Sequence, residues 1–225
     1  YQGDRMCWDM AREAAEAEGI RIGTVIIDDD VSVQNSTYTV GRRGVAGNFF
    51  VIKACGAASE EGRDLDQLVA LGQRVNGVVR TMGVALTGCT PPAKGKPIFT
   101  LADDEIEVGI GIHGEPGRRR AKLVPADKIV EEMFEAVAGD LPFAKGDRVG
   151  LMINGLGGTP ISELYLLYRK AALLCRDRGY TVVRNYVGEY CTSLEMAGVS
   201  LTLIRLDAEL ERLLAAPAEC PIRVF

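Results

Sequence analysis

Short apolar runs alternate with longer amphipathic segments along the whole sequence. Seven runs have the length and apolar content of strands: 21–27, 81–87, 98–101, 105–112, 148–153, 180–187 and 199–206. Six segments repeat apolar residues at helical spacing: 4–18, 45–58, 65–77, 125–138, 161–175 and 208–214. Because alternating strands and helices pack as layers, this pattern predicts an α/β fold with some α+β character.

A change of composition near the middle of the chain predicts its division. Residues 89–97 contain three of the nine prolines together with glycine and lysine, which is typical of a connector. We therefore expect two lobes, each with a mixed sheet flanked by helices. Residues 1–90 would form the C-terminal part of the first lobe. Residues 91–225 would form the second lobe, with the loop around His113 at its start.

Charge and cysteine content exclude several classes of protein. The net charge of −5 disfavours binding to nucleic acid or to an anionic membrane surface. No apolar run approaches the roughly 18 residues that a membrane span requires. The six cysteines include no C-x-x-C pair, which disfavours structural zinc and favours reduced thiols in a cytoplasmic protein. We expect no nucleic-acid partner, no membrane association and no metal site.

Two motifs suggest ligand chemistry and have simpler explanations. The acidic triplet Asp28-Asp29-Asp30 could bind a divalent cation, but consecutive acids point in alternating directions and more often form a solvated loop. The stretch 109–114 fits the dinucleotide pattern G-x-G-x-x-G. The turn Glu115-Pro116-Gly117 follows it in place of the helix that would bind a pyrophosphate, so we reject a nucleotide site there.

His113 is the single histidine of the sequence. It follows an apolar strand and enters a turn rich in glycine and proline, where the backbone can approach a small ligand closely. A neutral imidazole can serve as a base, a metal ligand or a nucleophile toward a carbonyl, although a lone histidine more often has a structural role. Asp4 opens the first predicted helix. As an N-cap it would stabilise that helix, and it would also lie at the entrance of a crevice beside the sheet.

Six stretches in collinear order carry a resemblance to a known family. They are Tyr-Gln-Gly-Asp at 1–4, Val-Ile-Ile-Asp-Asp-Asp-Val at 25–31, Gly-Arg-Arg-Gly-Val-Ala-Gly at 41–47, Gly-Lys-Pro at 95–97, Gly-Ile-Gly-Ile-His-Gly-Glu-Pro-Gly at 109–117 and Gly-Glu-Tyr-Cys-Thr-Ser-Leu-Glu-Met at 188–196. Together they resemble the dihydroxyacetone-binding subunit of dihydroxyacetone (glycerone) kinases.

The resemblance implies a role for each candidate site residue. His113 would attack the C2 carbonyl of dihydroxyacetone and hold it as a covalent hemiaminal, which selects the ketone over glycerol. Asp4 would hydrogen-bond the substrate hydroxyl and assist its phosphorylation. Gly111 and Gly114 would leave room for the substrate and the turn.

The resemblance also implies what the chain works with. A nucleotide-carrying donor subunit would supply the phosphoryl group, with ADP or ATP and Mg²⁺ bound there, so we expect no cofactor on this chain. We expect dependence on the phosphotransferase system rather than on ATP, and a homodimer. Arg42, Arg43 and residues 118–120 are candidate contacts for the donor. The alternatives are a non-catalytic dihydroxyacetone-binding coactivator of a transcription regulator and a kinase subunit for a larger ketose.

The sequence departs from the family at its start. Family members carry an upstream segment with a second histidine and a substrate-contacting lysine, and neither is present here. Because Tyr1 begins inside a family motif, we expect that the sequence is a piece of a longer chain and that the first lobe is incomplete. The other interpretation is a protein unable to run the whole reaction.

Overall fold

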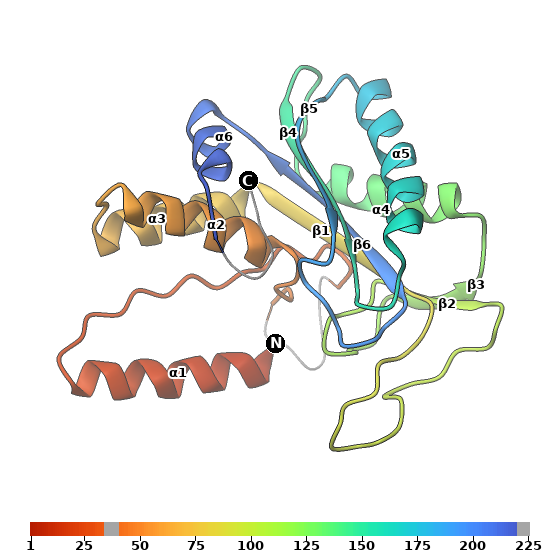
Figure 1. Cartoon of the computed structure of the whole chain (residues 1–225), viewed down its shortest axis with the longest axis horizontal. Coiled ribbons are helices and arrows are strands. Elements are labelled where there is room, and N and C mark those ends of the chain that lie inside the picture. The colour runs from red at the N-terminus through yellow and green to blue at the C-terminus, as the bar shows by residue number, and fades with distance from the viewer. Residues whose placement is uncertain (34–40, 220–225) are drawn as a thin grey trace.

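A six-stranded mixed sheet with helices on both faces forms the body of the protein in the computed structural model (Figure 1). The structure describes residues 1–33 and 41–219. The strand order is β3-β2-β1-β6-β4-β5. The strands are β1 (Val79–Ala85), β2 (Glu105–Val108), β3 (Arg119–Lys122), β4 (Arg148–Gly155), β5 (Thr181–Gly188) and β6 (Gly198–Arg205). The helices are α1 (Gln2–Ala17), α2 (Gly47–Glu60), α3 (Leu65–Gly77), α4 (Ala126–Asp140), α5 (Ile161–Asp177) and α6 (Ala208–Ala215). The predicted α/β class is confirmed.

The two faces of the sheet are covered by different helices. Helices α4 and α5 pack on one face, and α2, α3 and α6 lie on the other (Figure 1). Strand β4 illustrates the division, because Leu151 and Ile153 belong to the core under α4 and α5 whereas Met152 belongs to the core under α2. Strands buried on both faces read as continuous apolar runs, which is why β1, β4 and β6 were visible in the sequence.

The sheet differs from the expected pair of sheets. Strand β1 precedes the expected boundary at residue 90, yet it pairs antiparallel with β2 and along its whole length with β6, from Val79 opposite Ile204 to Ala85 opposite Gly198. Within the described residues, the strands on both sides of residue 90 therefore form one sheet. Long-range pairing of this kind leaves no local signal in the sequence.

Several predicted strand boundaries were also wrong. Residues 21–27 form no strand ladder, and Ile22 and Ile26 are exposed. Residues 98–101 are irregular, and the run predicted at 105–112 ends as a strand at Val108. The edge strand β3 was not among the predicted strands, because its charged residues lack the alternation of a half-buried strand.

Helix α1 stands apart from the core. It has no buried residue, and Trp8 is 73% exposed. The helix begins at Gln2, so Asp4 lies in its first turn and is not the predicted N-cap. A carboxylate in the first turn still interacts favourably with the helix dipole. By contrast, Asp64 caps the N-terminus of α3 and makes a reciprocal bond with Gln67.

Candidate active site

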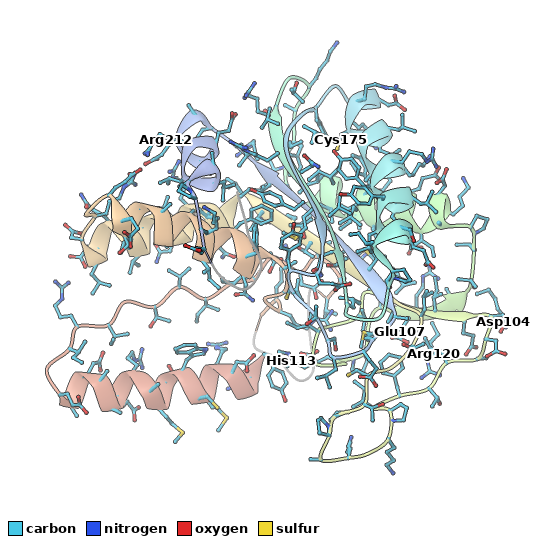
Figure 2. The ribbon with its side chains drawn as sticks, in the orientation of Figure 1. Asp104, Glu107, His113, Arg120, Cys175 and Arg212 are labelled. Carbon is cyan, nitrogen blue, oxygen red and sulfur yellow. The ribbon has the colours of Figure 1, made fainter. Side chains whose placement is uncertain are left out.

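His113 lies on the loop between β2 and β3, where the backbone folds back on itself (Figure 2). The amide of Arg118 donates to the carbonyl of Val108 at 2.7 Å, which closes the loop at its base. The amide of Gly114 donates to the carbonyl of Gly111 at 3.0 Å, which forms the turn around His113. These two bonds fix the backbone of the loop, and the His113 side chain is 34% exposed.

The start of helix α1 meets His113. The Asp4 Oδ2 atom lies 3.2 Å from His113 Nε2. The ring of Tyr1 stacks on the imidazole with centroids 4.1 Å apart and planes inclined by 20°. Figure 2 shows His113 at the end of α1 where the chain begins. The structure thus brings together the two residues that the resemblance paired, Asp4 and His113.

Glu115 is a third member of the site, although its sequence context predicted only a turn. Its Oε1 atom lies 3.6 Å from His113 Nδ1, and its Oε2 atom accepts the His113 backbone N–H at 3.1 Å. Burial opposes ionisation of this carboxyl. The hydrogen bonds from His113 and from its own amide, together with the positive charge of Arg43, outweigh burial and lower the pKa of Glu115. The signal in the sequence was its position two residues after His113.

The two predicted glycines are close to other parts of the protein. A Cβ on Gly111 would lie 2.2 Å from Glu115 Oε2, so the missing side chain leaves room for that carboxylate. Gly114 has a φ of 78°, and a Cβ there would lie 1.6 Å from the Ile98 side chain. These glycines allow the loop to close around its own partners, and their predicted contact with substrate stays a prediction.

The acidic triplet is solvated only at its first residue, because Asp28 is exposed whereas Asp29 and Asp30 are buried, contrary to the expected solvated loop. Asp29 is fully buried and accepts the amides of Val45 at 2.8 Å and Gly47 at 2.7 Å. Burial raises the pKa of Asp29 to about 6, although those amides and the Thr81 hydroxyl oppose the shift. Among residues 1–33 and 41–219, no group of three His, Cys, Asp or Glu side chains could hold a metal ion.

Asp30 pairs with Arg43 in the interior. The Arg43 Nε and Nη2 atoms lie 2.7 and 2.6 Å from Asp30 Oδ2, and the arginine side chain is 3% exposed. Arg43 also donates to the carbonyls of Gly109 at 2.7 Å and Pro116 at 3.2 Å. This buried pair therefore fixes both ends of the His113 loop. The prediction that Arg43 is a contact for a donor partner was wrong, because the side chain is buried.

The other predicted arginine contacts have partners inside the protein. Arg42 makes a two-pronged ion pair with Asp140, at 2.5 and 2.7 Å. Arg118 donates to the carbonyls of Val31 and Ser32. Arg119 and Arg120 remain about half exposed, beside Glu132 and Glu107. Among the predicted arginine contacts, exposure is thus greatest for Arg119 and Arg120 on β3, and whether they bind a donor stays a prediction.

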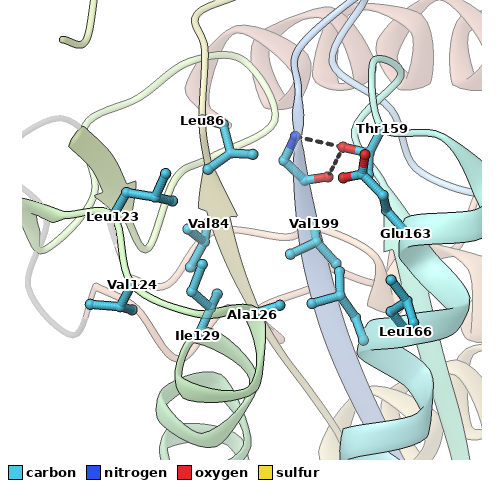
Figure 3. A pocket seen from close by; sticks show the side chains of 12 residues that line it. Val84, Leu86, Leu123, Val124, Ala126, Ile129, Thr159, Glu163, Leu166 and Val199 are labelled. Carbon is cyan, nitrogen blue, oxygen red and sulfur yellow. Dashed lines mark hydrogen bonds between the residues drawn. The ribbon is translucent and has the colours of Figure 1, made fainter. Parts of the chain in front are cut away.

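A separate apolar pocket of about 310 Å³ opens between β1, β6, α4 and α5 (Figure 3). Its lining includes Val84, Leu123, Ile129, Leu166 and Val199, with Thr159 and Glu163 at one side. The Thr159 hydroxyl bonds the backbone of Gly198, so it is already partnered. The pocket contains none of the site residues above.

None of the helices in the described ranges is long and apolar enough to cross a membrane.

The site is thus a histidine between two carboxylates, on a glycine-rich loop at the edge of an α/β sheet. Comparison with known proteins assigns the family. The chain matches the Dak1 domain over residues 1–222 and belongs to that family.

Several curated relatives are named as dihydroxyacetone or erythrulose kinases or as their subunits. The chain is 46% identical, over 93% of its length, to the dihydroxyacetone-binding subunit DhaK of the PTS-dependent dihydroxyacetone kinase 1 of Listeria innocua, and covers 64% of that subunit. It is 42% identical, over 98% of its length, to DhaK of the PEP-dependent kinase of Escherichia coli, and covers 69% of it. It is also 42% identical to the D-erythrulose kinase of Mycolicibacterium smegmatis, of which it spans 38%.

Solved structures of both kinases and coactivators resemble this fold. The dihydroxyacetone kinase operon co-activator Dha-DhaQ superposes with a TM-score of 0.86 at 33% identity, covering 93% of this chain and 65% of that one. The native dihydroxyacetone kinase of C. freundii superposes with a TM-score of 0.85 at 28% identity, covering all of this chain and 40% of that one. The fold is therefore shared by catalytic and regulatory proteins.

Proposed function

We propose that this chain is the dihydroxyacetone-binding part of a dihydroxyacetone kinase and that His113 holds the substrate as a hemiaminal. The observation that carries the proposal is the position of His113 between Asp4 and Glu115 on a partly exposed loop. The DhaK names of the relatives support the choice of substrate.

The chemistry of the imidazole fits a small ketone. A neutral imidazole nitrogen adds to the carbonyl carbon, the carbonyl oxygen becomes a hydroxyl, and the ring transfers one proton overall, so the adduct is reversible. Glycerol has no carbonyl and cannot form it. Asp4 lies close enough to the ring to face a substrate hydroxyl, where a carboxylate can accept its proton as the phosphoryl group arrives.

The phosphoryl group would come from a nucleotide-carrying partner. We propose that ADP or ATP and Mg²⁺ bind to that partner and that this chain binds no cofactor. The PTS-dependent and PEP-dependent names of the relatives favour a donor charged by the phosphotransferase system over one charged by ATP. A cytoplasmic location and a homodimer complete the proposal. Reduced cysteines fit the first, and two-fold symmetry is the commonest arrangement for enzymes of this kind.

Two other functions have specific support. The similarity to the Dha-DhaQ co-activator favours a protein that binds dihydroxyacetone and regulates transcription without phosphorylating it. The similarity to D-erythrulose kinase favours a four-carbon ketose as substrate, with the same covalent chemistry.

Phosphorylation assays with the donor subunit distinguish these functions. The wild-type protein, His113→Asn and the control Glu60→Gln, on the exposed end of α2, are each given dihydroxyacetone, erythrulose or glycerol. We expect dihydroxyacetone phosphate from wild type and control, no reaction with glycerol, and at least a 100-fold loss for His113→Asn. Faster turnover of erythrulose would establish the larger ketose. Adduct formation without turnover with any donor would favour the coactivator. Full activity of His113→Asn would contradict the proposal.

A further inference from the structure

Two carboxylates face the His113 ring from opposite sides, and a neutral imidazole carries only one ring proton. Asp4 lies 3.2 Å from Nε2 and Glu115 lies 3.6 Å from Nδ1. The ring can therefore donate to one carboxylate, and the other nitrogen keeps a lone pair. Which carboxylate takes the proton decides which nitrogen can attack a ketone.

We propose that Glu115 is a positioning residue that holds the ring proton of His113 on Nδ1 and so leaves the Nε2 lone pair for the carbonyl carbon. This inference rests on the proposed function of the same site. It assigns a role to a residue that makes no contact with the reacting carbon.

Glu115 is tied to the His113 loop, whereas Asp4 approaches the ring from a helix that has no buried residue. Glu115 Oε2 accepts the His113 backbone N–H at 3.1 Å, so the carboxylate is tied to the residue whose ring it faces. Its side chain is 20% exposed, against 58% for Asp4. Asp4 belongs to α1, which buries none of its residues. The separation of 3.6 Å between Nδ1 and Glu115 Oε1 is longer than a hydrogen bond, so the ring must approach this carboxylate by a few tenths of an ångström to donate its proton. Once formed, a hydrogen bond to this partly buried carboxylate is stronger than one to the solvated carboxylate of Asp4.

The missing side chain of Gly111 leaves room for the Glu115 carboxylate beside the loop. A side chain on Gly111 would lie 2.2 Å from Glu115 Oε2 and 2.9 Å from Arg43 Nη1. Arg43, held by Asp30, lies behind the loop and donates to the carbonyl of Pro116 at 3.2 Å. An ionised carboxylate is the form that accepts a ring N–H, and the positive charge of Arg43 favours that form of Glu115.

The resulting step balances without any further reactant. The Nε2 lone pair forms the bond to the ketone carbon while the carbonyl π electrons move to oxygen. The ring then carries a positive charge, and Glu115 is positioned to accept the Nδ1 proton. The alkoxide takes one proton from solvent, and Glu115 returns its proton to solvent. The net change is addition of the imidazole N–H across the carbonyl, with no oxidation or reduction.

The substitution Glu115→Gln tests this with little change of shape. The glutamine carbonyl can still accept the His113 backbone N–H, whereas its NH₂ group would face Nδ1 as a donor. It therefore favours the opposite tautomer, with the proton on Nε2 and no lone pair for attack. Glu115→Asp keeps the charge on a shorter side chain, and Glu60→Gln is the distant control.

The readout is ¹⁵N NMR of histidine-labelled protein at a pH where titration shows the ring to be neutral, with the His113 signals assigned by their loss in His113→Asn. In wild type we expect a protonated Nδ1 and an unprotonated Nε2. In Glu115→Gln we expect these two signals to exchange character, and the rate of adduct formation with dihydroxyacetone to fall about tenfold or more. Glu115→Asp should retain the wild-type tautomer and part of the rate.

The outcomes separate this inference from the proposed function. If wild type forms the adduct but carries its proton on Nε2, or if Glu115→Gln leaves tautomer and rate unchanged, the role of Glu115 is wrong and the function stands. If wild type forms no adduct although it binds dihydroxyacetone, the proposed function itself fails. A merely structural role of Glu115 would lower stability without exchanging the two nitrogen signals.

Discussion

The Asp4 carboxylate lies 3.2 Å from His113 Nε2, although the two residues belong to parts of the protein that differ in how they are attached to the core. The histidine lies on a loop held by backbone bonds and by the buried Arg43, whereas Asp4 lies on a helix without a buried residue. Substitutions on the two sides of this contact should therefore have different effects. Changes at Asp4 should act on chemistry, and changes behind the loop should act on stability.

Asp4→Asn should slow phosphoryl transfer and leave the hemiaminal intact. The amide cannot accept a proton from the substrate hydroxyl, and loss of a general base costs about 10²- to 10⁴-fold in rate. The free energy of unfolding should change by less than about 0.5 kcal/mol, because Asp4 is exposed. Turnover with the donor subunit and urea unfolding measure the two effects, with Asp9→Asn on the same helix as control. Loss of the adduct in Asp4→Asn would contradict this division of roles.

Arg43→Met should lower the free energy of unfolding by about 3–5 kcal/mol, because it leaves Asp30 buried without its partner. The double variant Arg43→Met/Asp30→Leu removes both charges and should recover part of that loss. Urea unfolding of the wild type and the two variants gives the comparison. Equal stability of Arg43→Met and wild type would show that the pair does not hold the loop.

Gly114→Ala should destabilise the His113 loop by about 1–3 kcal/mol. The residue has a φ of 78°, and the new methyl group must displace the end of the Ile98 side chain. Binding of dihydroxyacetone should weaken in parallel. The matched control is Gly139→Ala in α4, where a Cβ meets no atom within 4 Å and alanine favours the helix. If both variants unfold like the wild type, the turn is less constrained than its geometry indicates.

Thiol alkylation at pH 8 should distinguish the cysteines. Burial raises the pKa of Cys175 to about 12. The pKa of Cys191 is also raised to about 12, chiefly by burial and to a smaller extent by the nearby charge of Asp29. About one thiol in 10⁴ is then ionised at pH 8. Cys7 is exposed and should react first. Peptide mass spectrometry after brief iodoacetamide treatment, with Cys7→Ser as control, measures this order. If Cys175 is alkylated as fast as Cys7 in the folded protein, the Cys175 thiol is not buried as the structure shows.

The helices and the buried strands could be predicted from the sequence because they depend on local patterns. The Asp64–Gln67 cap and the apolar run of β4 are signals within a few residues. The joining of the strands into a single sheet could not be predicted, because β1 pairs with β6, which lies far away in the sequence. The edge strand β3 lacks an apolar face, so its charged residues indicated a turn.

The candidate site shows the same limit. His113 and Asp4 were found through motifs, and the structure brings them together. Asp29 and Asp30 were predicted to be solvated because their partners lie elsewhere in the sequence. These partners are the amides of Val45 and Gly47 for Asp29 and the side chain of Arg43 for Asp30. Glu115 was missed because nothing in a turn sequence shows that its carboxylate folds back to the histidine before it. Burial and folding back both depend on tertiary contacts, which a pattern does not contain.

The most direct test of the central claim is the bond between His113 and the ketone. Protein with ¹⁵N-labelled histidine is saturated with dihydroxyacetone labelled with ¹³C at C2, and NMR is used to detect one-bond coupling between the two nuclei. We predict a tetrahedral C2 signal coupled to the Nε2 of His113, absent from His113→Asn. A bound C2 signal that remains a ketone or its hydrate, with no coupling to nitrogen at saturation, would contradict the account.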